Sequence, residues 1–151
     1  TSPLELAHVR GDMRFDIAAC FGVLHHLYGE ISRVDLLDEM LSALKSPGLV
    51  CLSFWQPLKN TRYLEQSQRN IGILRRAHPH IPFDAFGAHD LLLSWQERRD
   101  VFRFVHSFTK QEIAEFLANA TSMYPDVKIR SIFKTNAGND TNNTYAILQK
   151  G

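Results

Sequence analysis

The chain has 151 residues, a formal net charge of +1 and 44% hydrophobic residues. This length and composition are typical of one compact folded domain and exclude a disordered tail. No run of about 18 apolar residues is present, and the N-terminus lacks the charged and apolar segments of a secretory signal. We therefore expect no membrane partner and a cytoplasmic location, with the nucleus as an additional compartment.

The first predicted element is a strand over residues 14–23, where the apolar residues run on without alternating, as in a parallel strand covered on both faces. A helix is expected over residues 32–48, with Ser32 as its cap, Asp35 in the capping-box position and "SPG" at its end. A second buried strand follows over residues 48–57. Strand, helix and strand in this order predict a right-handed crossover and a parallel strand pair.

Residues 58–100 have weaker periodicity, and we interpret them as an insertion that binds substrate and contains a helix over residues 61–76. Basic residues on and beside this helix are Lys59, Arg62, Arg69, Arg75 and Arg76, and a second patch contains Arg98 and Arg99. Such patches attract phosphates without reading sequence. A solvated helix face explains the same pattern, and the two interpretations remain open.

The C-terminal third predicts one more helix and two strands. Thr109 and Glu112 form a capping box at the start of "SFTKQEIAEFLANA", and strands are expected over residues 126–135 and 143–150. The short segment between these strands favours antiparallel pairing. The predicted fold class is α/β, the C-terminal half of a doubly wound, Rossmann-like sheet that ends in an antiparallel hairpin, with its first half missing.

The segment "CFGVLHHLYGE" marks the candidate site, because ligands of open α/β sheets bind outside the carboxyl ends of the strands. Gly22 allows the backbone to approach a ligand closely. Adjacent side chains such as His25 and His26 seldom converge on one ion, and no Cys, Asp or Glu cluster accompanies them, so we predict no metal. The alternative is that one imidazole is solvated and the other packs against the sheet.

"FDIAACFGVLHHL" and "LLDEMLSALKSPGLVCLSFW" resemble motif IV, the next helix and the fifth strand of class I S-adenosylmethionine-dependent methyltransferases. "SPLELAHVRGDMRFD" resembles the segment after their third strand, with Ser2 at an acidic position. "DLLLSW", "VFRFVHSFTKQEIAEFL" and "NNTYAILQK" are similar to the tail of the tRNA wobble-uridine carboxymethyl methyltransferases, including the methyltransferase domain fused to an AlkB-type oxygenase. Val105 and Thr144 replace two aromatic residues of those patterns.

The resemblance implies an enzyme that uses S-adenosylmethionine to esterify the carboxymethyl group of a tRNA wobble uridine. It implies tRNA as the substrate and, in eukaryotes, a small zinc-binding activator protein as a partner. Residues implied at the cofactor are Cys20, Phe21, Gly22 and His26, and Asn143 is implied at the substrate. Alternatives are a methyltransferase for a small molecule or another RNA, and a non-catalytic, methyltransferase-like interaction module.

Methyl transfer to a carboxylate needs alignment more than a strong base, because the acceptor is already ionised at neutral pH. Arg103 is expected to hold the carboxylate through its planar fork, and His106 to donate a further hydrogen bond. Without the family pattern, an Arg and a His before a helix are more often surface or capping residues than substrate ligands, by about three to one, and the pattern favours the functional interpretation. Trp55 is expected at a strand end, where it either stacks on the base or closes the core.

The chain lacks the glycine-rich turn and the acidic residue with which such enzymes hold the cofactor. We therefore expect the 151 residues to be the C-terminal part of a longer enzyme and to bind the cofactor weakly when alone. The first strand is expected to have an open edge.

Overall fold

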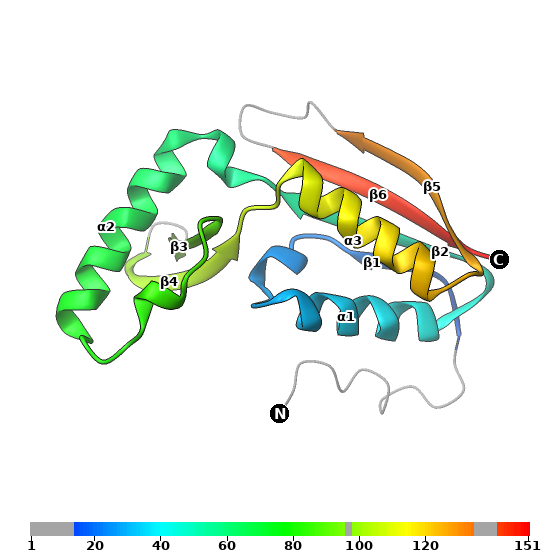
Figure 1. Ribbon diagram of the computed structural model, residues 1–151, viewed down its shortest axis with the longest axis horizontal. Helices are drawn as coiled ribbons and strands as arrows, with labels where there is room; N and C mark the ends of the chain where they lie inside the picture. The colour runs from blue at the N-terminus through cyan, green and yellow to red at the C-terminus, as the bar shows by residue number, and fades with distance from the viewer. Residues whose placement is uncertain (1–13, 96–97, 135–141) are drawn as a thin grey trace.

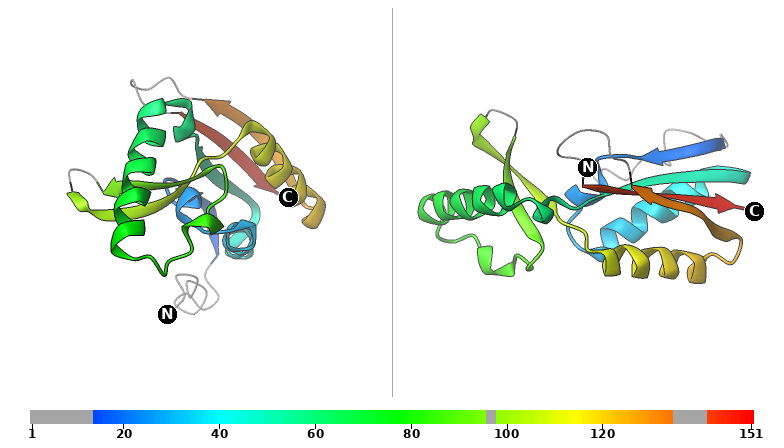
Figure 2. Two further views of the ribbon diagram at one scale, coloured as in Figure 1. Left: turned by 60° about the vertical axis from the view of Figure 1, so that its left-hand side comes forward. Right: turned by 90° about the horizontal axis from the view of Figure 1, so that it is seen from above.

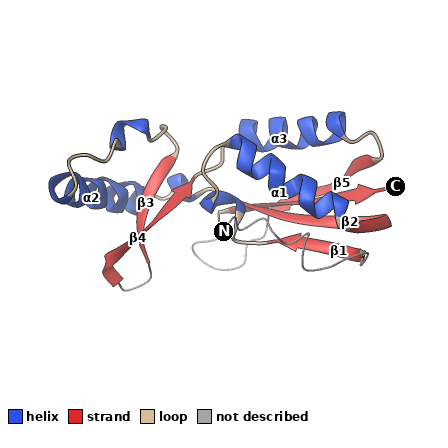
Figure 3. Cartoon of the chain, turned by 90° about the horizontal axis from the view of Figure 1, so that it is seen from below, coloured by secondary structure: helices blue, strands red, loops and turns tan. Residues whose placement is uncertain are grey.

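The computed structural model describes residues 14–95, 98–134 and 142–151. These residues form two units (Figure 1). The sheet unit is a four-stranded sheet of order β1-β2-β6-β5 with α1 and α3 on one face (Figure 3). The hairpin unit is a two-stranded sheet, β3-β4, that packs against α2. Among the described residues, no helix combines the length and the apolar character needed to cross a membrane.

The predicted parallel pair is confirmed: β1 (Phe15–Cys20) and β2 (Leu44–Trp55) run parallel, with Ala18 beside Val50 and Cys20 beside Leu52. The helix between them, α1, spans Glu30–Ser42. This pair brings the carboxyl ends of two neighbouring strands to one edge of the sheet, where a ligand site was expected.

The predicted bounds of this helix are wrong at both ends. Gly29, with a φ of 78°, is the N-cap, so that Ser32 lies within the first turn instead of capping it. The strand begins at Leu44, before "SPG", because Leu44 already pairs with Phe15 and the Phe15 N–H donates to the Ala43 carbonyl. The Leu44 side chain is buried, and this packing explains why the strand begins before the "SPG" sequence that was expected to end the helix.

The C-terminal elements agree with the sequence. The helix α3 spans Lys110–Met123 and begins with the predicted capping box of Thr109 and Glu112. The strands β5 (Val127–Lys134) and β6 (Asn143–Lys150) are antiparallel, and β6 lies between β2 and β5. The core is the space between the sheet and its two helices, where Val50, Leu52 and Phe54 of β2 are buried.

The outer strand β1 pairs only with β2 among the described residues. Ile17 on this strand is 59% exposed. The strand carries its apolar residues to both faces of the sheet, although the described helices cover only one of them (Figure 3).

The hairpin unit was only partly predicted. The helix α2 (Thr61–Ala77) has the expected bounds to within one residue, whereas β3 (Asp90–Trp95) and β4 (Arg98–His106) were not expected. Short 3-10 turns also occur at Leu24–His26, Pro57–Lys59 and Phe83–Ala85. The three consecutive leucines of β3 do not alternate with polar residues, because α2 covers one face of the hairpin while the other face is also buried. The unit extends from the end of the sheet unit, as Figure 2 shows from two further sides.

Candidate functional site

The chain turns sharply where β1 ends. Gly22 has a φ of 71°, a conformation that side-chain-bearing residues rarely adopt. Its N–H donates to the Ser53 hydroxyl on β2 at 3.0 Å. A side chain at this glycine would meet no atom within 4 Å, so the backbone faces open space. The turn at Gly22 and its bond to Ser53 place this backbone at the edge of the sheet where β1 and β2 end.

Arg103 reaches this edge from β4. Its guanidinium carbon lies 5.7 Å from the ring centre of Trp55 and 5.0 Å from that of Trp95, which are cation–π distances. Trp55 also contacts His25, at 5.0 Å between ring centres, and Tyr63 of α2, at 5.4 Å. We term these five residues the Arg103 cluster. The predicted proximity of Trp55, the end of β1 and Arg103 is present in the structure.

His25 is the buried member of the histidine pair. Burial, followed by the nearby charges of His26 and Arg103, lowers the pKa of His25 to about 3, so the imidazole is neutral at physiological pH. His25 Nδ1 and Arg103 Nε are both buried and have no hydrogen-bond partner among the described residues. Buried polar atoms without partners are rare in native proteins. The polar groups of this cluster are therefore not fully satisfied within the described residues.

His26 ties the loop to the hairpin unit. Its Nδ1 donates to the Phe104 carbonyl oxygen at 2.8 Å. The adjacent histidines therefore have different environments: His25 packs on Trp55, and His26 fixes the position of β4 beside the turn.

His106 does not join the Arg103 cluster. Three residues along a strand place Arg103 and His106 on opposite faces. His106 Nδ1 lies 2.7 Å from Asp90 Oδ1 and Nε2 lies 3.2 Å from Glu112 Oε1. Both partners are carboxylates, which only accept hydrogen bonds, so His106 is the donor in each bond.

This arrangement makes His106 a bridge between the units, because Asp90 begins β3 and Glu112 lies in the first turn of α3. Burial alone raises the pKa of Glu112, but hydrogen bonds from the backbone and side chain of Thr109, with the charges of His106 and His89, outweigh burial and lower it. The ionised Glu112 therefore serves both the helix cap and the bridge. We term His106, Asp90 and Glu112 the carboxylate bridge.

The remaining predicted site residues lie around the same strand edge. Cys20 is buried in the core, and burial, partly offset by a backbone hydrogen bond from Leu24, raises the pKa of its thiol. Phe21 is 57% exposed and contacts Tyr145. Asn143 pairs directly with Trp55 across β2 and β6. Ser2 lies outside the described residues.

Trp95 was missed by the sequence analysis. Its position at the end of an unexpected strand, paired with Arg98, brings it over Arg103. In the sequence, the one indication of Trp95 is that an aromatic residue ends "DLLLSW". Its proximity to Arg103 follows only from the pairing of β3 with β4. Of the predicted basic patch at residues 98 and 99, Arg98 is paired with Asp100 at 2.8 Å.

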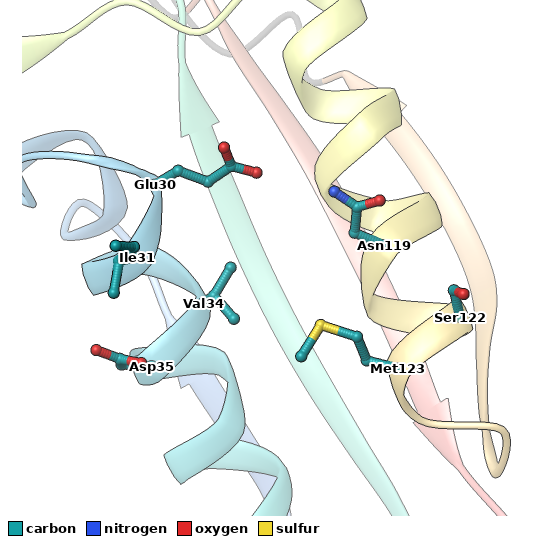
Figure 4. Close-up of a pocket in the computed structure, with 7 residues that line it drawn as sticks. All are labelled: Glu30, Ile31, Val34, Asp35, Asn119, Ser122 and Met123. Atoms are coloured by element: carbon teal, nitrogen blue, oxygen red, sulfur yellow. The ribbon is translucent and has the colours of Figure 1, made fainter.

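A separate groove lies between α1 and α3, with Ile31, Val34 and Met123 on its walls and Glu30 at one end (Figure 4). None of the predicted site residues lines it. The groove therefore does not belong to the Arg103 cluster.

No protein-family model matches the chain, and no curated protein sequence matches it. Solved structures do. A methyltransferase from Methanosarcina mazei described as S-adenosylmethionine-dependent is 18% identical, with a TM-score of 0.61 over 92% of this chain and 62% of that one. A Burkholderia thailandensis 1,6-didemethyltoxoflavin-N1-methyltransferase, solved with 1,6-didemethyltoxoflavin and S-adenosylhomocysteine, is 16% identical, with a TM-score of 0.54 over 99% of this chain and 48% of that one.

A third similar structure is an S-adenosylmethionine-dependent methyltransferase from Clostridium acetobutylicum, 10% identical, with a TM-score of 0.50 over 93% of this chain and 60% of that one. The chain thus spans between 48% and 62% of the length of these three proteins. At such low identity the likeness concerns the fold alone. The chain has the mixed α/β fold of part of the S-adenosylmethionine-dependent methyltransferases.

Proposed function

We propose that this chain carries the acceptor side, and part of the cofactor side, of an S-adenosylmethionine-dependent methyltransferase, with β1 and β2 as the fourth and fifth strands of its sheet. The similar folds of three solved methyltransferases support this proposal. One of them was solved with S-adenosylhomocysteine, the product that the methyl donor leaves. The donor supplies an electrophilic methyl group when it is bound.

Residues at the end of β1 fit such a cofactor. The Gly22 backbone faces open space at a positive φ, which allows a close approach. The Phe21 ring is more than half exposed and thus available for contact. Cys20 contributes its backbone, and His26 holds the turn by its bond to β4. These residues position the donor and shield it from water rather than take part in bond making.

We further propose that the acceptor is a carboxylate, specifically the carboxymethyl group of a tRNA wobble uridine. The observation that carries this proposal is Arg103, whose guanidinium lies against Trp55 at the strand edge and keeps Nε without a partner among the described residues. A planar guanidinium matches a carboxylate in charge and shape. Trp55 offers a surface on which a base stacks, and Asn143 lies beside it.

Neutral His25 supports an acceptor that needs no deprotonation. A buried imidazole beside Arg103, with its pKa lowered to about 3, is a poor general base at neutral pH. A carboxylate arrives already ionised, whereas most amine and hydroxyl acceptors must lose a proton. His106 assists indirectly in this proposal, since both of its nitrogens are bonded in the carboxylate bridge.

The experiment is methyl transfer by the full-length protein from labelled S-adenosylmethionine to an anticodon stem-loop that contains 5-carboxymethyluridine. Arg103→Met should reduce transfer by at least about tenfold, because a hydrogen bond to a charged group is lost. Arg130→Met, a matched loss of charge on the exposed β5, should leave it unchanged. Equal activity in the Arg103 variant and the wild type would contradict the proposed acceptor site.

A small-molecule acceptor is the second candidate, favoured by the toxoflavin precursor named for the Burkholderia structure. The same assay with free 5-carboxymethyluridine separates the candidates. Equal transfer to the nucleoside and the stem-loop would favour the small molecule. A chain that binds the cofactor analogue S-adenosylhomocysteine but transfers to neither would favour another acceptor.

A further inference from the structure

Three arginines on α2 share one side of the helix. Arg62, Arg69 and Arg76 are separated by seven residues each, which is nearly two full turns. Successive members are thus displaced by about 10 Å along the axis and point in nearly the same direction. All three side chains are exposed. We term them the arginine row.

Two hydrogen bonds on the inner face of α2 fix the direction in which the arginine row points. Ser67 Oγ accepts from the Leu92 N–H at 2.9 Å, and Asn70 Nδ2 donates to the Leu92 carbonyl at 2.9 Å. Both bonds are buried and hold the helix in one rotational position on β3. The arginine row is therefore held at the side of the helix, away from the face that contacts the hairpin.

The arginine row forms no ion pair among the described residues, whereas neighbouring arginines do. Arg75 pairs with Asp84 at 2.7 Å, and Arg98 pairs with Asp100. Glu65 lies about one turn from Arg62 and Arg69, yet within the described part of the chain no ion pair joins it to either. Three exposed charges on one rigid element thus remain available to a partner.

The charges of the sequence are unevenly divided. Residues 58–106 contain 8 Lys and Arg against 5 Asp and Glu, a formal charge of +3. The other residues contain 9 against 11, a formal charge of −2. The segment that contains Arg103 is therefore the positive part of a nearly neutral protein, which favours an anionic partner on that side.

We propose that the arginine row binds backbone phosphates of an RNA strand. Neighbouring arginines are about 10 Å apart, which is more than one nucleotide step, so each guanidinium contacts a separate phosphate. Guanidinium groups suit phosphate oxygens in charge and geometry. The choice of RNA rests on the proposed function, because α2 also carries Tyr63 of the Arg103 cluster and thus connects the row to the acceptor site.

The test is the salt dependence of RNA binding, measured by the fluorescence anisotropy of a labelled anticodon stem-loop with the 151-residue chain. A triple variant replaces Arg62, Arg69 and Arg76 with Gln. A control triple variant replaces Arg75, Lys128 and Arg130 with Gln, so that both lose the same net charge from exposed positions. Circular dichroism melting confirms that each variant is folded.

Each phosphate contact contributes about 0.7 to 0.9 to the slope of log K against log salt. The arginine-row variant should lose about 2 to 3 from this slope, and the control variant should keep most of it. Equal losses in both variants would overturn the proposal, because net charge alone would explain them. The proposal is also overturned if the wild type does not bind the RNA or if the arginine-row variant keeps its slope.

A methyl-transfer assay distinguishes a failure of this inference from a failure of the proposed function. If the row binds RNA but the acceptor is wrong, the slope changes as expected while no methyl group is transferred to carboxymethyluridine. If the acceptor is right but the row is not used, the arginine-row variant transfers methyl groups with an unchanged KM for the stem-loop, which overturns the inference.

Discussion

The sheet unit and the hairpin unit are stabilised in different ways. The sheet unit has a continuous apolar core, in which Phe54, Leu117 and Leu148 are almost completely inaccessible to solvent. The hairpin unit has a small apolar cluster of Leu91, Leu93 and Val105 and depends on buried polar bonds and aromatic contacts. Hydrophobic burial is non-directional, whereas hydrogen bonds and cation–π contacts require defined positions. The sheet unit thus contains most of the apolar core, whereas the hairpin unit adds Arg103, Trp95 and Tyr63 to the Trp55 and His25 side chains of the sheet unit.

The largest expected effect is in the sheet unit. Phe54 is fully buried between the rings of Phe108 and Phe116, at 5.1 and 5.8 Å between centres. Phe54→Ala should lower the free energy of unfolding by about 3–5 kcal/mol, because it removes apolar contacts and leaves a cavity. Urea denaturation measures the change. Phe133→Ala, at a 42% exposed position, is the control. An equal loss of stability there would contradict the conclusion that the buried core stabilises the sheet unit.

The second-largest loss of stability is expected when the carboxylate bridge is removed. His106→Ala removes both hydrogen bonds that join β3 to α3 and leaves the mostly buried Asp90 side chain with only the bond from the Gly87 N–H among the described residues. The expected loss in unfolding free energy is about 2–3 kcal/mol. His80→Ala, at an exposed position, serves as the control in the same urea titrations. A loss no larger than that of the control would mean that the bridge does not hold the units together.

The third effect depends on pH and concerns His25. In the unfolded chain a histidine binds a proton with a pKa of about 6.5, whereas burial, His26 and Arg103 lower the pKa of His25 in the folded chain to about 3. Below pH 6.5 the unfolded state therefore binds more protons, and stability falls as the pH decreases. The slope contributed by this residue is at most about 1.4 kcal/mol per pH unit.

Thermal melts at several pH values between 7 and 4 measure this slope against His25→Phe, which keeps a ring beside Trp55 but cannot titrate. The variant should lose less stability on acidification than the wild type. Parallel pH profiles would show that His25 is not held neutral by the Arg103 cluster.

The smallest expected effect is at the capping box. Thr109 accepts a hydrogen bond from the Glu112 N–H at 3.0 Å, and Thr109→Ala should reduce stability by about 1 kcal/mol. Thr121→Ala in the same helix is the matched control, since its exposed hydroxyl bonds only to the Ala118 carbonyl within the described chain. Equal melting temperatures for the two variants would indicate that the cap contributes little.

Sequence patterns predicted the sheet unit well, because its elements follow periodic burial. The parallel pair, α3 with its capping box and the terminal antiparallel pair were all anticipated. The start of α1 was not, since the Gly29 turn took the place of the expected Ser32 cap. The strand β3 was missed because its run of three buried leucines, 91–93, is too short to distinguish a strand from a buried helix segment.

The sequence by itself determined which residues are chemically suited to a site, including Arg103, Trp55 and the histidine pair. Only the tertiary structure decided that Arg103 lies between Trp55 and Trp95, and that His106 joins two carboxylates on the opposite face. The physical reason is that strand pairing sets the face and the neighbours of each side chain, and these partners are far apart in the chain.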